Sequence, residues 1–265
     1  MVDRKMVLQH LKTQWAYLKI SIKTALEYRL NFIVQTISMI LNDLVWMIFW
    51  FIIFNKFTQI NGWKMQDMIL LYTVILVAYG ITGVFFGNRS KIAISIVEGR
   101  LDYYMTLPKN ILYHLLTSRA SWFSLGDLLL GMGLAFAFIP LNQVPLYILL
   151  VILSSIIILS FSIISGSLAF FMDNSEETCR TLNMGLISFA SYPISIYQGF
   201  TRILILLIIP AGFVSGVPVQ LLKSFDMTWL LYMIGFTILL TIVAISVFYY
   251  GLRKYESGNL LYVRT

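Results

Sequence analysis

The chain has 265 residues, of which 59% are hydrophobic and 12% are charged, and its formal net charge is +7. Soluble domains carry about 25% charged residues, so this composition excludes an ordinary soluble protein. The basic residues lie between long apolar stretches, where anionic lipid accounts for them and no nucleic-acid partner is implied. We expect a single all-α integral membrane domain over residues 1–265, with no room for a separate soluble domain.

The first 29 residues have the pattern of an amphipathic helix lying on a membrane. Apolar residues recur along one helical face, and Lys5, Lys12 and Lys19 recur along another. Such a helix places its apolar side at the headgroup boundary and its lysines near lipid phosphates. The segment is either a lead-in that anchors the first span or an elbow helix with a specific role at the cytoplasmic surface.

Apolar stretches that reach or approach the ~20 residues needed to cross the hydrocarbon layer follow along the chain. The clearest are Leu30–Phe54, Met68–Gly87, Trp122–Ile139, Leu146–Met172 and Leu230–Tyr250. The first contains Asn42 and Asp43 near its middle, and the third contains Asp127. A carboxylate at such a depth must be protonated, paired or facing water. It either lines a cavity or a proton-linked site, or it forms a structural hydrogen bond between helices.

The connection over residues 88–121 is long for neighbouring membrane helices, which need ~2–8 residues. It is rich in mixed charge and aromatic residues around Glu98–Asn110. A loop of this kind is a docking or functional surface, or else a solvated connector with a short surface helix.

Two further apolar stretches, Leu182–Tyr197 and Ile203–Leu222, contain helix breakers, among them Pro193 and Pro210. Interrupted helices at membrane depth are tolerated where protein or a cavity shields the freed backbone groups. We take the first stretch as the fifth span. The second then belongs to a re-entrant or outer-face hairpin over residues 198–227, which leads to the sixth span.

The Lys and Arg residues support this topology. With six spans and both ends inside, 15 of the 19 basic residues lie on the cytoplasmic side, as the positive-inside rule requires. Seven spans would place Arg253 and Lys254 outside.

The sequence contains no signature of an enzyme or of a metal site. It has no G-x-x-x-x-G-K-[ST] phosphate-binding loop and no G-x-S-x-G nucleophile motif. Its two histidines, His10 and His114, are far apart, and Cys179 is its only cysteine. We expect no catalytic residue, no metal and no cofactor in this chain.

Residues Glu98–Asn110 read E-G-R-L-D-Y-Y-M-T-L-P-K-N, and they resemble the G-x-L-D-x-x-L-x-x-P region after the second span of type-2 ABC transporter permeases. More narrowly, the chain resembles the small permeases described as components of uncharacterised ABC-type transport systems. Further matching stretches are Tyr192–Tyr197, Ile209–Pro218 and Tyr250–Asn259.

The resemblance implies a half-transporter of a prokaryotic cytoplasmic membrane. Two six-span permeases, either two copies of this chain or this chain and a different paralogue, would dock onto two copies of an ATP-binding subunit that holds ATP and Mg. The resemblance assigns contact with the ATPase to Glu98, Arg100, Leu101, Asp102 and Tyr103. It suggests a dimer interface along the first and fifth spans, which places Asn42, Asp43, Tyr192 and Tyr197 near the substrate path.

The apolar character of these spans favours export of an amphipathic or hydrophobic cargo, such as a drug, a lipid-like molecule or a peptide. The alternative is a secondary, ion-coupled transporter. Matching broken helices in both halves would indicate that class, but only the C-terminal half is clearly interrupted.

Overall fold

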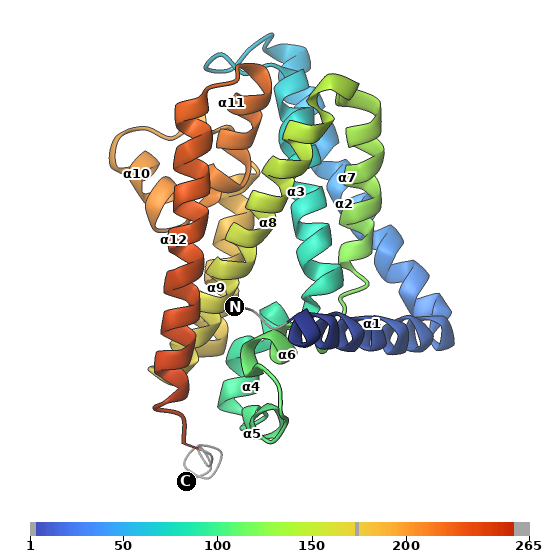
Figure 1. Ribbon diagram of the computed structural model, residues 1–265. Helices are drawn as coiled ribbons and strands as arrows, with labels where there is room; N and C mark the ends of the chain where they lie inside the picture. Colours follow the sequence, from blue (N-terminus) through green and yellow to red (C-terminus); the bar gives the residue numbers. More distant parts are fainter. Residues whose placement is uncertain (1–3, 173–174, 257–265) are drawn as a thin grey trace.

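The computed structural model describes residues 4–172 and 175–256, and the regular secondary structure within them is helical apart from one isolated bridge between Ile60 and Trp63. Helix α1 (Arg4–Glu27) lies across one end of a bundle of long helices (Figure 1). The bundle comprises α2 (Arg29–Lys56), α3 (Met65–Phe85), α7 (Ser124–Phe138), α8 (Val144–Ser167), α9 (Ser175–Ala190) and α12 (Met227–Leu252).

Four of these helices are long and apolar enough to cross a membrane, namely α2, α3, α8 with its flanking turns, and α12. A bent pair, α10 (Gly199–Leu207) and the helix through α11 (Val217–Lys223), supplies a fifth candidate. Helix α7 is apolar but has only 15 residues, which corresponds to about 22 Å of rise. Helix α9 begins with the polar run Ser175–Arg180.

The centre of the bundle is α3, which packs against α7 on one side and α8 on the other. Fifteen of its 21 residues are buried. Gly80 permits the close approach to α7, because a Cβ there would lie 2.6 Å from Cβ of Leu128 and 2.7 Å from its backbone. Small residues at such positions let two membrane helices pack backbone to backbone.

Helix α2 contacts the bundle through one narrow stripe. Its four buried residues are Thr36, Asp43, Trp50 and Phe54. The first three are seven positions apart and therefore share one helical face. The remaining faces expose large apolar side chains, which suit lipid or a partner subunit.

The outer hairpin is interrupted, as the Pro and Gly residues predict. Its two parts, Gly199–Leu207 and Gly212–Lys223, meet at 77° across residues 208–211, and the second part begins with a π-helical turn, Gly212–Gly216. Neighbouring helices satisfy groups in this region: Ser154 donates to the carbonyl of Val214 at 2.8 Å, and Ser215 donates to that of Ala190 at 2.6 Å. Helix α11 is buried in the bundle, whereas α10 exposes most of its residues.

The predicted fifth span differs in extent from the helix observed. Helix α9 ends at Ala190, and the chain continues through Pro193 into a short 3₁₀ turn, Ile194–Ile196. Proline has no N–H to donate and disfavours the helical conformation of the residue before it, which accounts for the early end.

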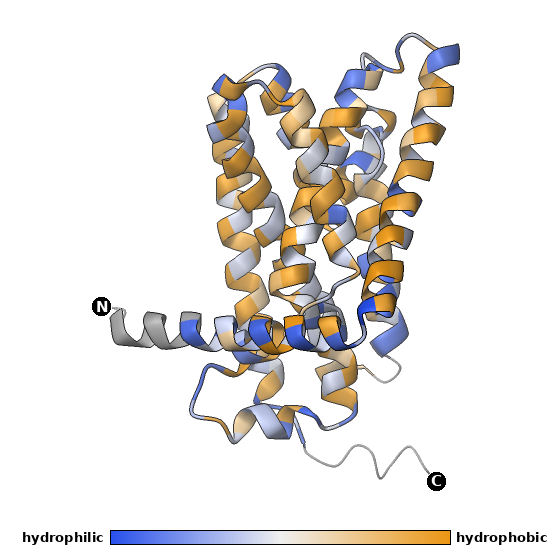
Figure 2. Cartoon of the chain, turned by 90° about the vertical axis from the view of Figure 1, so that its right-hand side faces the viewer, coloured by the Kyte–Doolittle hydropathy of each residue, from blue (hydrophilic) through white to orange (hydrophobic). Residues whose placement is uncertain are grey.

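Polarity is distributed as a membrane requires. The bundle is dominated by apolar residues along its length, whereas α1 and the segments beyond it carry many polar ones (Figure 2). Helix α1 and the C-terminal end of α12 lie at the same end of the bundle (Figure 1).

Candidate functional site

The segment between α3 and α7 folds into a compact helical group, here called the basal unit (residues 87–117). It contains a 3₁₀ helix, Gly87–Lys91, and the short helices α4 (Ile92–Val97), α5 (Leu101–Met105) and α6 (Ile111–Thr117). It lies at the α1 end of the bundle (Figure 1). The predicted connector of residues 88–121 is thus mostly helical.

Local sequence shapes the basal unit. Gly99 has a φ of 70°, a left-handed conformation that glycine adopts freely, and it turns the chain from α4 into α5. The Asn110 side chain accepts the N–H of Tyr113 at 2.9 Å and caps α6. Fully buried Leu101 and Leu115 join an apolar cluster that includes residues of α8 and α12. This cluster fixes the basal unit to the bundle.

The predicted ATPase-contacting residues lie around α5. Arg100 and Tyr103 are exposed, the latter by 62%. Glu98 forms an ion pair with Arg100, and Leu101 is buried. Arg100, directly before α5, and Tyr103, within it, therefore present a guanidinium and an aromatic ring to the outside. Leu101 packs into the apolar cluster on the opposite side of the helix.

Asp102 is half-buried, and its carboxyl group lies next to the hydroxyl of Tyr255, which follows α12. Burial and the neighbouring Asp102 carboxyl group together raise the pKa of the Tyr255 hydroxyl to about 12. The Tyr255 ring also meets Phe170 edge-on, with centroids 6.1 Å apart. These contacts connect α5 to the ends of α8 and α12.

Helix α1 is tied to the basal unit by polar side chains. The contacts are Lys109 Nζ to Thr13 Oγ1 at 2.8 Å, the Tyr113 hydroxyl to Gln14 Oε1 at 2.7 Å, and the Tyr17 hydroxyl to the ring of His114. Beyond the unit, Trp122 Nε1 donates to the carbonyl of Ser21 at 3.2 Å. None of these contacts was predicted from the sequence, because no local pattern pairs residues about 100 positions apart.

The predicted lysines of α1 fit a surface helix. Lys12 and Lys19 are exposed, and Lys19 lies 5.5 Å above the ring of Trp15, which is itself 58% exposed. The side chain of Lys5 lies outside the described residues. The described part of α1 therefore presents both apolar and basic groups to its surroundings.

The four predicted pathway residues have different environments. Asn42 is exposed, whereas Asp43 is only 4% exposed. Tyr192 is half-buried and meets the ring of Trp50 edge-on at 5.6 Å. The Tyr197 hydroxyl donates to the carbonyl of Phe189 at 3.2 Å. Asp43 and Tyr192 thus lie on the buried side of α2.

The structure brings Asp43 together with Asp127 of α7, and the two carboxyl groups lie within hydrogen-bonding reach of each other. The sequence marked both carboxyl groups but did not pair them. The spacing of Thr36, Asp43 and Trp50 by seven residues is the signal that identifies the buried face of α2.

Arg89, in the 3₁₀ helix after α3, was not singled out by the sequence. Its guanidinium lies 5.2 Å from the ring of Tyr79 and donates to Ser162 of α8 at 3.0 Å. Ser162 in turn donates to Asn183 of α9 at 2.8 Å. This chain of hydrogen bonds joins the basal unit to two bundle helices.

A cavity of about 490 Å³, lined by both charged and apolar residues, lies between the basal unit and α9. Its lining includes Arg89, Lys91, Arg100, Arg180 and Asn183. Because Arg100 belongs to the predicted ATPase-contacting set, the cavity adjoins that surface from inside the protein.

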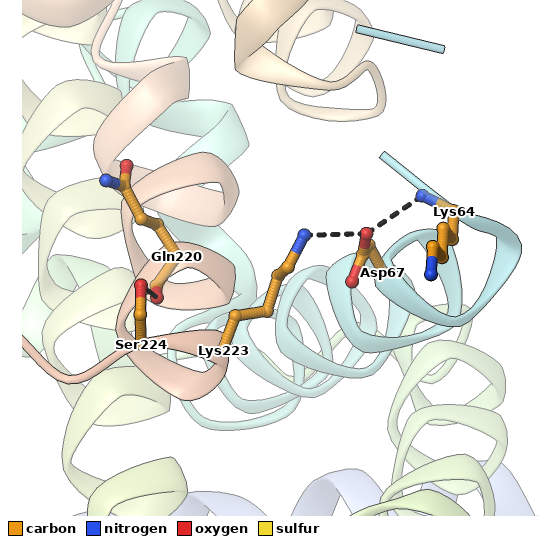
Figure 3. Close-up of polar contacts among 5 residues, drawn as sticks. All are labelled: Lys64, Asp67, Gln220, Lys223 and Ser224. Carbon is orange, nitrogen blue, oxygen red and sulfur yellow. Dashed lines mark hydrogen bonds and ion pairs between the residues drawn. The ribbon is translucent and has the colours of Figure 1, made fainter. Parts of the chain in front are cut away.

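At the opposite end of the bundle, a polar clasp joins α3 to α11 (Figure 3). Asp67 Oδ2 accepts hydrogen bonds from the main-chain N–H of Lys64 and from Lys223 Nζ, both at 2.8 Å. Lys223 also lies 5.7 Å from the centroid of the Trp63 ring. The clasp holds the end of the outer hairpin against the bundle.

Within residues 4–172 and 175–256, no group of three or more His, Cys, Asp or Glu side chains is placed to hold a metal ion.

The apolar helices and their arrangement define a multi-pass α-helical membrane protein. A family model described as ABC-2 family transporter protein matches residues 40–258, and the chain belongs to that family. This match confirms the resemblance to type-2 ABC permeases. No curated protein and no solved structure matches the chain.

Proposed function

We propose that this chain is the membrane-spanning subunit of an ATP-driven exporter. Two copies of a separate ATP-binding subunit, carrying ATP and Mg, bind below a dimer formed with a second permease, which is a different paralogue or another copy of this chain. The complex moves an amphipathic or hydrophobic cargo, such as a drug, a lipid-like molecule or a peptide, across a prokaryotic cytoplasmic membrane. This chain contributes no catalytic residue.

The observation that carries this proposal is the outward surface of α5. Arg100, the N-cap residue of α5, and Tyr103, within the helix, are exposed there, and Leu101 between them is buried. Arginine and tyrosine dominate the binding energy of protein interfaces. A rigidly anchored helix that presents both is suited to transmit the motion of a docked subunit.

The fold offers two routes for that motion. One runs from α5 through Asp102 and Tyr255 to α12. The other runs from the basal unit through Arg89 and Ser162 to α8 and α9. Closing of the ATPases would thus reach α8, α9 and α12 and open the path alternately to each face.

The arrangement also supports six passes with both ends cytoplasmic. Helix α9 together with the bent segment through α11 makes one net crossing, after which α12 returns to the end where α1 lies (Figure 1). That end carries most of the basic residues, which the positive-inside rule places in the cytoplasm. The entire chain forms one permease domain, with residues 1–29 as its elbow, 88–121 as its coupling segment and 198–227 as its outer hairpin.

Co-purification tests the proposal. The chain, its Arg100→Glu variant and its Tyr103→Ala variant are extracted gently from native membranes, and bound proteins are identified by mass spectrometry. We expect the wild-type chain to retain an ATP-binding subunit and each variant to lose most of it. Any second permease recovered in the same eluate establishes a heterodimer.

The matched control is Arg202→Glu, which reverses an exposed arginine of α10, away from the basal unit. This variant should retain the ATPase as the wild-type chain does. Recovery of no ATPase from wild type even after crosslinking would contradict the proposal.

The second candidate is an ion-coupled secondary transporter. The observation that favours it is the buried carboxyl pair of Asp43 and Asp127, since carboxyl groups inside a membrane commonly serve proton relays. Transport by the purified chain alone, driven by an ion gradient without ATP, would support this candidate.

A further inference from the structure

Asp43 and Asp127 are buried where an ion is costly. They are 4% and 5% exposed, and they belong to α2 and α7, two helices that pack along each other inside the apolar part of the protein. An uncompensated charge at such a depth costs several kcal/mol, so each carboxyl group needs a partner or a proton.

The neighbouring glycine explains why the two carboxyl groups meet. A Cβ on Gly126 would lie 2.6 Å from the carbonyl oxygen of Thr36 and 2.9 Å from Cβ of Met39. Only glycine allows this approach of α7 to α2. Asp127 follows immediately, and Asp43 lies one helical turn beyond Met39, so the contact brings their side chains within hydrogen-bonding reach.

One oxygen of each carboxyl group has no hydrogen-bond partner. Ionised carboxylates only accept hydrogen bonds, and Oδ2 of Asp43 and Oδ1 of Asp127 are both buried without a partner. The neighbouring Asn42 belongs to the exposed side of α2. Two facing carboxyl groups form a hydrogen bond when one of them is protonated, as in other carboxyl pairs that share a site.

The surrounding groups come from each element packed around the pair. Helix α3 contributes the phenols of Tyr72 and Tyr79, which are neutral donors, and the segment after it contributes Arg89, whose charge acts on Asp127. Guanidinium remains charged in proteins. One arginine, two carboxyl groups and one proton have zero net charge, the state that costs least in an apolar interior.

We propose that Asp43 and Asp127 form a proton-binding site inside the membrane domain, in which the two carboxyl groups share one proton and Arg89 balances the remaining negative charge. The bound proton holds α2 against α7. Its release adds a second negative charge to a site with one cation, and the two carboxylates then repel each other across the helix contact. This site is separate from the ATPase-contacting surface of α5.

Infrared spectroscopy of the purified full chain in nanodiscs tests this site without depending on transport or on any partner. A protonated carboxyl group has a C=O stretch that is distinct from carboxylate bands and that shifts in D₂O. We expect this band at neutral pH in the wild-type chain and its loss in the Asp43→Asn, Asp127→Asn double variant. Size-exclusion elution and helix content show whether each variant is folded.

The control is Asp67→Asn, which removes the carboxylate that Lys223 pairs with and should leave the band unchanged. Absence of the band from wild type, or its persistence in the folded double variant, would overturn the proposal. Spectra in sodium and in choline chloride separate a proton from a metal cation. A band that appears only when sodium is withdrawn assigns the site to Na⁺ and also overturns it.

Discussion

Asp67 and Lys223 are 156 positions apart in the chain, yet their contact joins α3 to α11 at the end of the bundle opposite α1. The side chain of Asp67 is 10% exposed and that of Lys223 is 38% exposed. Because the lysine is partly exposed, water and salt screen its charge, and the attraction between the two charges adds little to the free energy of unfolding. The contact matters mainly for the nearly buried carboxylate of Asp67, which would keep only one hydrogen-bond donor if the lysine were removed.

We expect Lys223→Met to lower the free energy of unfolding by about 1–2 kcal/mol, because Asp67 then retains only the main-chain N–H of Lys64. Lys64→Met is the matched control, since the contact from Lys64 to Asp67 is made by the backbone (Figure 3). Thermal unfolding in detergent compares the two variants. Equal stability of both would show that the clasp contributes nothing measurable.

At the scale of the element, close helix contacts depend on particular glycines. On α7, a Cβ at Gly131 would lie 2.8 Å from Cβ of Leu76 and 2.9 Å from the backbone nitrogen of Val77, whereas a Cβ at Gly133 meets nothing within 4 Å. Both positions belong to one helix and differ only in what they face.

Gly131→Ala should therefore destabilise the protein by about 1–3 kcal/mol, because the added methyl group forces α3 and α7 apart. Gly133→Ala should be neutral or stabilising by up to about 1 kcal/mol, since alanine is the better helix former. Thermal unfolding in nanodiscs measures both. Destabilisation by Gly133→Ala equal to that by Gly131→Ala would contradict the packing described for this helix pair.

The sequence predicted the elements better than their contacts. Apolar length located α2, α3, α8 and α12, and the Pro and Gly residues located the break in the outer hairpin. The end of α9 differed from prediction because an apolar composition continues through Pro193, where the helix does not. The pairing of Asp43 with Asp127 depends on Gly126, and one sequence read alone does not show which helix a glycine faces.

In the candidate site, too, the local features could be predicted from the sequence and the long-range contacts could not. The exposed and buried residues of α5 are local features, and the resemblance of Glu98–Asn110 directed attention to them. Arg89 and the contacts of α1 with His114 depend on packing between segments far apart in the chain. Periodicity detects the faces of a helix, but the partner of each face is set by the tertiary fold.

At the scale of the whole molecule, the proposed topology places the two ends of the bundle on opposite sides of the membrane. Tyr103, on the basal unit, and Phe225, between α11 and α12, are 62% and 60% exposed and mark these ends. The native Cys179, which is 2% exposed, is the one cysteine of the sequence. A Cys179→Ser background therefore allows a single cysteine to be introduced at either position and labelled.

We expect a membrane-impermeant maleimide to label the Phe225→Cys variant in intact cells and the Tyr103→Cys variant only after permeabilisation. Tyr103 lies at the basic end of the bundle, which the positive-inside rule places in the cytoplasm, and Phe225 lies at the other end. Reversed labelling would invert the orientation and leave α5 unable to meet a cytoplasmic ATPase. Labelling of both positions from outside would exclude the single net crossing from α9 to α11, because the two marked ends would then share one side of the membrane.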